Sequence, residues 1–140
     1  MSTAFSGFLE VKLLGHTLLG SSYTAPSTIW VALATTITTD ANSLADITEV
    51  TTNTGYTRML LSSKLSAPTS GPNWTCATSE TITFPTATTP WGLVGYVTVM
   101  TSTTIGQGDC LYWGALDSSR QVIANDIVQF AAGSFWIRLS

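Results

Sequence analysis

Beyond Gly20, the sequence is a series of short apolar or alternating runs, and each run stops at residues that favour turns. In the last run, for example, Phe135 and Ile137 flank Trp136. This period of two places successive side chains on opposite faces of a β-strand. The candidate strands lie near 28–33, 56–61, 80–84, 93–101, 110–116, 120–124, 126–130 and 134–139.

Threonine and the turn residues strengthen this interpretation. The chain has 25 Thr and 16 Ser among 140 residues, and β-branched Thr suits a pleated, half-buried surface better than a helix. About eight short strands at this spacing predict an all-β domain over residues 21–140, a β-sandwich or jelly roll of antiparallel strands. The expected turns lie at Pro85, Pro90, Gly106, Gly108, Asp117-Ser118-Ser119 and Gly133.

The first twenty residues follow a different period. Apolar residues and one histidine recur there at spacings of three and four, which predicts one amphipathic helix near residues 4–19. Ser2 and Thr3 are candidate N-caps, and Gly20 is a candidate C-cap. We expect this segment, residues 1–20, to contribute to assembly, packing either on its own domain or on a neighbouring subunit. The stripe consists of Phe5, Phe8, Leu9, Leu13 and His16.

Charge is scarce. Only 9% of residues are charged, against roughly 25% in ordinary soluble domains, so we expect much of the surface to lie against other subunits. The net charge of −3 and the scattered basic residues argue against a nucleic-acid partner. No run approaches the roughly 18 apolar residues of a membrane span. The N-terminus also lacks the pattern of a secretory signal, so we expect an intracellular origin.

Residues for chemistry are equally scarce, and we expect no catalytic residue, cofactor or metal. The single histidine, His16, lies on the apolar stripe, where a packing or interface role is expected. Cys76 and Cys110 match no metal motif and are expected to be small buried hydrophobes, although a disulfide between them stays open. The acids of the polar stretch 36–54, Asp40, Asp46 and Glu49 with Asn42, are interpreted as solvated loop residues rather than a calcium site.

The tryptophans offer candidate contacts. If Ile29 and Val31 point into the core, Trp30 points outward, and the same alternation turns Trp136 outward. An outward Trp is either an interface anchor or covered by another layer, and both alternatives stay open. With the helical stripe, the complete set of interface candidates is Phe5, Phe8, Leu9, Leu13, His16, Trp30 and Trp136.

Several stretches, in fixed order over nearly the whole chain, resemble a family of small tailed-phage virion proteins. The resemblance implies a jelly-roll fold, no active site, synthesis in the bacterial host cytoplasm and a place in the virion. Members include capsid cement (decoration) proteins of short-tailed phages, to which the resemblance is strongest, and proteins labelled tail fibre. The sequence departs from the family pattern between residues 36 and 54. The matching stretches are Gly55-Tyr56-Thr57-Arg58, Ile82-Thr83-Phe84-Pro85-Thr86-Ala87 with Trp91-Gly92, Tyr112-Trp113-Gly114-Ala115-Leu116, and Phe130-Ala131-Ala132-Gly133-Ser134.

Three functions follow as hypotheses. The first is a non-enzymatic cement protein on the capsid surface, whose partners are the major capsid protein and itself, as a homodimer rather than a trimer. The second is a tail-fibre or baseplate component with a receptor- or glycan-binding role. The third is a carbohydrate-binding module or weak hydrolase, for which Trp74 and Trp91 are the candidate sugar-contacting residues.

Overall fold

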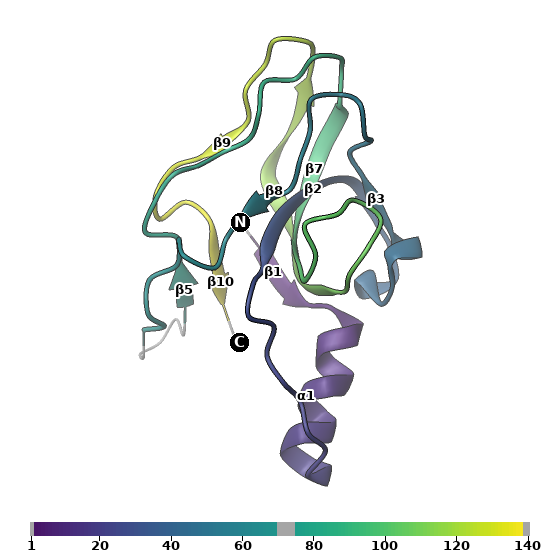
Figure 1. Ribbon diagram of the computed structural model, residues 1–140, viewed down its shortest axis with the longest axis vertical. Coiled ribbons are helices and arrows are strands. Elements are labelled where there is room, and N and C mark those ends of the chain that lie inside the picture. Colours follow the sequence, from purple (N-terminus) through teal and green to yellow (C-terminus); the bar gives the residue numbers. More distant parts are fainter. Residues whose placement is uncertain (1, 70–74, 139–140) are drawn as a thin grey trace.

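The computed structural model describes residues 2–69 and 75–138, and it is an all-β sandwich with one N-terminal helix (Figure 1). This confirms the predicted fold class. The larger layer is an antiparallel sheet in the order β1-β8-β7-β2-β3, with β4 also pairing with β2. Its elements are β1 (Ser2–Phe5), β2 (Trp30–Ile37), β3 (Ile47–Glu49), β4 (Met59–Leu60), β7 (Gly92–Met100) and β8 (Cys110–Val122).

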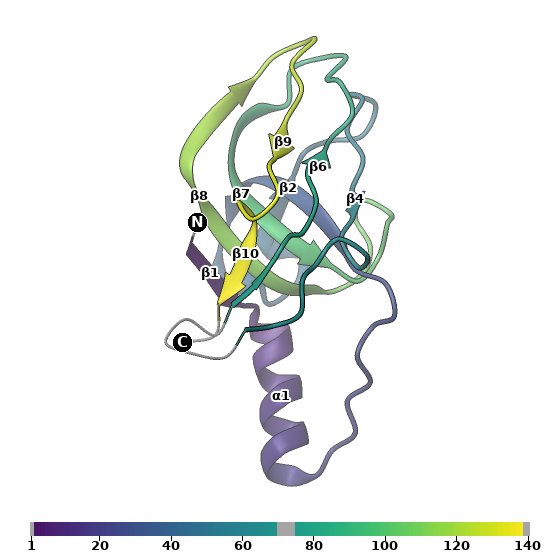
Figure 2. The same ribbon diagram turned by 90° about the vertical axis from the view of Figure 1, so that its left-hand side faces the viewer.

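Two small antiparallel sheets form the opposing layer. One pairs β5 (Thr75–Ala77) with β10 (Trp136–Arg138), and the other pairs β6 (Ile82–Thr83) with β9 (Gln129–Phe130). Figure 2 shows β6, β9 and β10 lying in front of the larger sheet. The core fills the space between the layers, where Val31 and Leu33 of β2 meet residues such as Phe84 and Phe135. These side chains are almost completely buried.

One predicted turn is wrong. Asp117-Ser118-Ser119 does not separate two strands but lies inside the single long strand β8. The register explains this, because Val94 pairs with Arg120 and Tyr96 pairs with Ala115, so that a two-residue step on β7 faces a five-residue step on β8. The polar triplet therefore bulges out of the ladder instead of reversing the chain. The end of the predicted strand 134–139, Leu139, lies outside the described residues.

The helix α1 (Gly7–Leu19) begins later than predicted. Ser2 and Thr3 are not its caps, because residues 2–5 form β1 and pair with residues 112–115 of β8. The N-cap is Ser6, whose side chain accepts a hydrogen bond from the Leu9 N–H at 3.1 Å and donates one to the Cys110 carbonyl. The helix ends at Gly20, which has the left-handed conformation of a C-cap (φ 68°), as predicted.

The polar stretch 36–54 first packs on the larger sheet around Ala41 and then joins the sheet as β3. It contains two short 3₁₀ turns, η1 (Thr39–Ala41) and η2 (Leu44–Asp46), followed by β3. All three residues of η1 have positive φ, between 50° and 53°, a conformation that costs roughly 1–2 kcal/mol for each non-glycine residue. The buried Ala41 packs there in a second apolar cluster with Ala32, Met100 and Cys110, and this packing offsets the strain.

Candidate interaction surfaces

One side of α1 packs on its own domain. Leu9 is buried, and Phe8 and Leu13 are half-buried against the main core. Phe5 belongs to β1, and its ring lies 5.4 Å from that of Tyr112 on β8. Four of the five residues of the predicted stripe therefore contact the sandwich of the same chain.

The fifth residue of the stripe, His16, is exposed near the far end of the helix. Its Nδ1 lies 3.0 Å from the carbonyl oxygen of Ser21. The backbone N–H of Ser21 in turn donates to the Gly15 carbonyl at 3.0 Å. His16 thus holds the chain as it leaves the helix. An interface role for this residue stays a prediction.

The opposite side of α1 is apolar and exposed. Val11, Leu14 and Leu18 form a row at spacings of three and four and are 71%, 57% and 75% exposed. At about 100° per residue, Leu18 lies directly across the helix from the buried Leu9. We call Val11, Leu14 and Leu18 the outer row. Sequence reasoning missed it, although its spacing is the same signal that identified the buried stripe.

A hollow of about 380 Å³ lies beside the outer row, lined by Phe5, Glu10, Leu13 and Leu14. Leu14 belongs both to the hollow and to the row. The ammonium group of Lys12, the basic side chain on this helix, lies 5.6 Å from the centre of the Phe8 ring. The outer row contains no charged residue, and both Glu10 and Lys12 lie off it.

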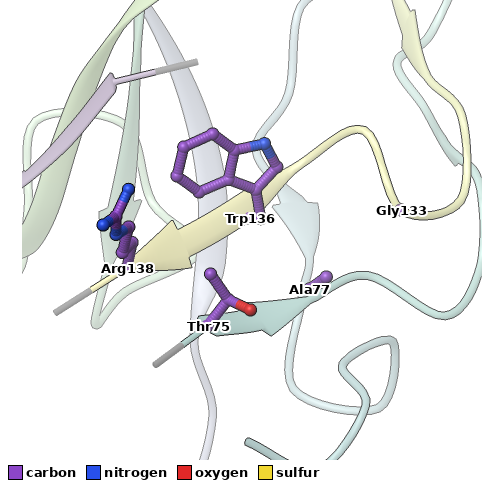
Figure 3. A pocket seen from close by; sticks show the side chains of 5 residues that line it. All are labelled: Thr75, Ala77, Gly133, Trp136 and Arg138. Carbon is purple, nitrogen blue, oxygen red and sulfur yellow. The ribbon is translucent and has the colours of Figure 1, made fainter. Parts of the chain in front are cut away.

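A second surface is the outward face of the β5–β10 sheet, shown in Figure 3. Trp136 stands opposite Ala77 and Arg138 opposite Thr75 in the register. These four side chains and Gly133 line an open groove of about 340 Å³. The residues before and after Trp136 on its strand are buried, so Trp136 points away from the core as the alternation predicts.

The other tryptophans differ in exposure. Trp30 is half-buried at the start of β2, where it is paired with Leu60 on one side and Met100 on the other. Trp91 is buried, and its indole N–H donates to the Thr54 carbonyl at 2.9 Å. The prediction of Trp91 as a sugar-contacting surface residue is therefore wrong. The other sugar-contacting candidate, Trp74, lies outside the described residues.

The conspicuous polar cluster of the described chain is closed rather than open to ligands. Arg58 is buried and makes a two-pronged ion pair with Glu49, with Nε–Oε1 2.8 Å and Nη2–Oε2 2.7 Å. Its Nη1 donates to the carbonyls of Ser102 and Gln107 at 2.7 and 2.9 Å. Arg58 therefore fixes the loop between β7 and β8, in which Gly106 and Gly108 adopt positive φ.

Tyr56 completes this cluster. Its hydroxyl donates to Glu49 at 2.8 Å and accepts from the backbone N–H of Leu33 at 2.9 Å. Burial, and then the nearby Glu49 charge, raise the pKa of the Tyr56 phenol far above its usual value. Glu49 was predicted to be a solvated loop acid, which is wrong, because it belongs to β3 and is paired with Arg58.

The cysteines are both free, which excludes a disulfide between them in this structure. Cys110 is buried, as expected, and Cys76 is half-buried. Their thiols donate to the carbonyls of Tyr112 and Ser66, each at 3.2 Å. Burial raises the pKa of the Cys110 thiol to about 12, so this group is a poor nucleophile at neutral pH.

Among residues 2–69 and 75–138, no three His, Cys, Asp or Glu side chains gather closely enough to hold a metal ion. No helix in the same residues has the length and apolar character needed to cross a membrane.

Comparison with known proteins places the chain among phage proteins. A family model described as podophage GP4 fiber I protein gp80 matches residues 4–138. The match begins within β1 and includes α1 and all of β2–β10. No curated protein matches the chain.

Proposed function

We propose that this chain, which belongs to the podophage GP4 fiber I protein gp80 family, is a non-enzymatic structural subunit of the tail fibres of a short-tailed phage. The observation that carries this proposal is the family match over residues 4–138. Because the match extends over both the helix and the sandwich, it concerns the whole architecture rather than one shared motif.

The geometry supports a structural rather than an enzymatic role. The charged and polar groups of Arg58, Glu49 and Tyr56 are hydrogen-bonded to one another and to backbone carbonyls. His16 contacts a backbone carbonyl in an exposed position. By contrast, α1 and the β5–β10 sheet present apolar and aromatic side chains to the outside, which is the composition of protein contact surfaces.

The decisive experiment is to locate the chain in the particle. Purified virions would be labelled with gold-conjugated antibodies raised against the purified chain and imaged by electron microscopy. We expect gold at the tail. Antibodies preincubated with the purified chain provide the control, since specific label must then disappear. Gold confined to the capsid shell would overturn the fibre proposal.

A capsid cement role is the second candidate, and the scarcity of charge on the surface favours it, because such a surface is suited to broad contact with a shell. In that case the partners are the major capsid protein and further copies of the chain. Binding to the assembled shell would stabilise it by mass action. Virions that lack the chain would then burst at lower temperature or milder osmotic shock than complete virions, and equal resistance would reject this role.

A further inference from the structure

We propose that a cleft between β8 and β9, which belong to different layers of the sandwich (Figure 2), binds a single neutral sugar residue. The cleft has a volume of about 270 Å³ and is lined by side chains of β7, β8 and β9 and of the residues beside β9. Pockets for drug-sized ligands measure roughly 300–1,000 Å³, so the occupant of this cleft is small. One sugar ring, alone or at the end of a glycan, has a suitable size.

The base of the cleft is apolar. It consists of Val94, Val122 and Val128, which are buried and belong to the main core. The half-buried Phe130 adds an aromatic side chain. A sugar ring carries C–H groups on its faces, and these groups pack well on apolar and aromatic side chains. A bare ion would instead lose its hydration against such a base without compensation.

The mouth of the cleft is polar. The exposed residues Ser118 and Arg120 lie on β8, and the exposed residue Gln129 lies on β9, so polar side chains border the cleft from both layers. Together they supply a hydroxyl group, guanidinium donors, and an amide that both donates and accepts hydrogen bonds. The hydroxyl groups of a sugar project outward from the ring and also donate and accept. The apolar base and the polar mouth therefore match the two kinds of surface that a sugar presents.

The bulge in β8 forms part of this mouth. In a regular strand, neighbouring residues point to opposite faces, so Asp117 and Ser118 would not both line the same cleft. They do so because residues 116–119 bulge out opposite Gly95 of β7. Gly95 leaves room for the bulge, since a Cβ at this position would lie 3.0 Å from the Ser119 hydroxyl oxygen. Such bulges are common next to active sites, where they re-aim side chains.

Two features favour a neutral sugar over a protein or an ion. Serine and aspartate are depleted in protein interfaces relative to the rest of the surface, yet Asp117, Ser118 and Ser134 all border this cleft. The lining also contains one acidic and one basic residue, Asp117 and Arg120, whose formal charges cancel. A neutral compound with many hydroxyl groups is therefore the ligand that suits the cleft.

The test is a titration of the full chain, isotope-labelled for NMR. It uses glucose, galactose, mannose, rhamnose and N-acetylglucosamine at millimolar concentrations, and separately glycerol and inorganic phosphate. We expect at least one sugar to shift the backbone amide signals of Ser118, Arg120 and Gln129 along a saturable curve. Glycerol, which has hydroxyl groups but no ring, and phosphate should leave these signals in place.

Two glutamine variants then locate the site. Gln129→Ala removes a hydrogen-bonding side chain from the mouth and should raise the Kd of the bound sugar about fivefold, the effect of losing one hydrogen bond between uncharged groups. Gln121→Ala is the matched control, because Gln121 is also exposed on β8 but faces away from the cleft, and it should leave the Kd unchanged. The amide spectrum of each variant shows whether its fold is intact.

Several outcomes would overturn the inference. One is that no sugar shifts the signals of the cleft residues, and another is that the two glutamine variants weaken binding equally. Shifts with phosphate alone would identify an anion site instead. Shifts with glycerol as large as those with the sugars would mean that the cleft does not recognise a ring.

The inference adds a binding role to the proposed structural role, and the two can fail separately. A chain that labels the tail but responds to no sugar would keep the fibre role and lose the sugar site. A chain that binds a sugar in the cleft but labels only the shell would keep the site and lose the fibre role.

Discussion

Replacing Arg58 with methionine tests whether the buried ion pair and its two carbonyl contacts hold the loop between β7 and β8 to β3. The substitution keeps much of the side-chain volume and removes the charge and its donors. It leaves Glu49 without its cation, and it leaves the carbonyls of Ser102 and Gln107 without the donor that they share. The loop between β7 and β8 then loses its direct link to β3.

The expected loss of stability follows from these contacts. Removing one partner of a buried ion pair costs about 3–5 kcal/mol, because the other charge remains uncompensated. The Glu49 side chain is 11% exposed, so water can solvate part of its uncompensated charge and lower the loss of stability. We therefore expect Arg58→Met to lower the free energy of unfolding by about 3 kcal/mol, a large share of the roughly 5–15 kcal/mol of a typical domain.

Urea unfolding followed by tryptophan fluorescence measures this difference. The dependence of the free energy of unfolding on urea concentration should have the same slope in the wild type and the variants. Arg120→Met is the matched control, because Arg120 is exposed on β8 and its loss should change stability by less than about 0.5 kcal/mol. A loss below about 1 kcal/mol for Arg58→Met would refute the reasoning, since it would mean that the ion pair and its two carbonyl contacts contribute little.

Three further predictions concern stability, each measured by urea unfolding. Ser6→Ala removes both the N-cap of α1 and the donor to the Cys110 carbonyl, so it should cost about 1–2 kcal/mol, and a loss below about 0.5 kcal/mol would contradict this role. Gly55→Ala should cost at least about 1 kcal/mol, because φ at Gly55 is 83° and the new Cβ would lie 2.5 Å from the Thr86 carbonyl oxygen. Gly133→Ala should cost less, since its φ of 79° is similar but its Cβ would meet nothing within 4 Å. Equal losses of stability in the two variants would contradict the clash at Gly55. Burial raises the pKa of Cys110 to about 12 and also raises the pKa of Tyr56. Because these groups lose their protons at lower pH in the unfolded chain than in the folded chain, the free energy of unfolding should fall from about pH 9 towards pH 12. Cys110→Ala should remove part of this decline, and a wild-type stability that does not change over this range would contradict the effect of burial.

The fold was predictable where short-range pattern and long-range packing agree. The apolar alternation around Trp136 indicated a strand with one buried face, and the structure has β10 there with its neighbours buried. Gly20 was identified as the C-cap because a left-handed residue is a local requirement. The bulge at Asp117-Ser118-Ser119 was not predictable, because whether a polar triplet turns or bulges depends on the strand beside it.

The polar cluster shows the same limit. Gly55-Tyr56-Thr57-Arg58 stood out as a motif, but nothing in its residues revealed that Arg58 is buried or that Glu49 is its partner. The two residues lie close in the sequence, and a polar stretch of this composition is usually a solvated loop. Burial of Arg58 arises only when the carbonyls of Ser102 and Gln107, far along the chain, close over it. Such a site depends on tertiary contacts that no local pattern records.

The helix α1 illustrates how one periodic signal conceals another. The stripe around Leu9 satisfied the expectation that an amphipathic helix has one apolar side, so the second row with Leu14 and Leu18 was not recognised. The structure separates the two rows because it buries one and leaves the other exposed. An exposed apolar row is the kind of surface that protein partners cover, and the outer row is therefore the side of α1 where we expect a further contact.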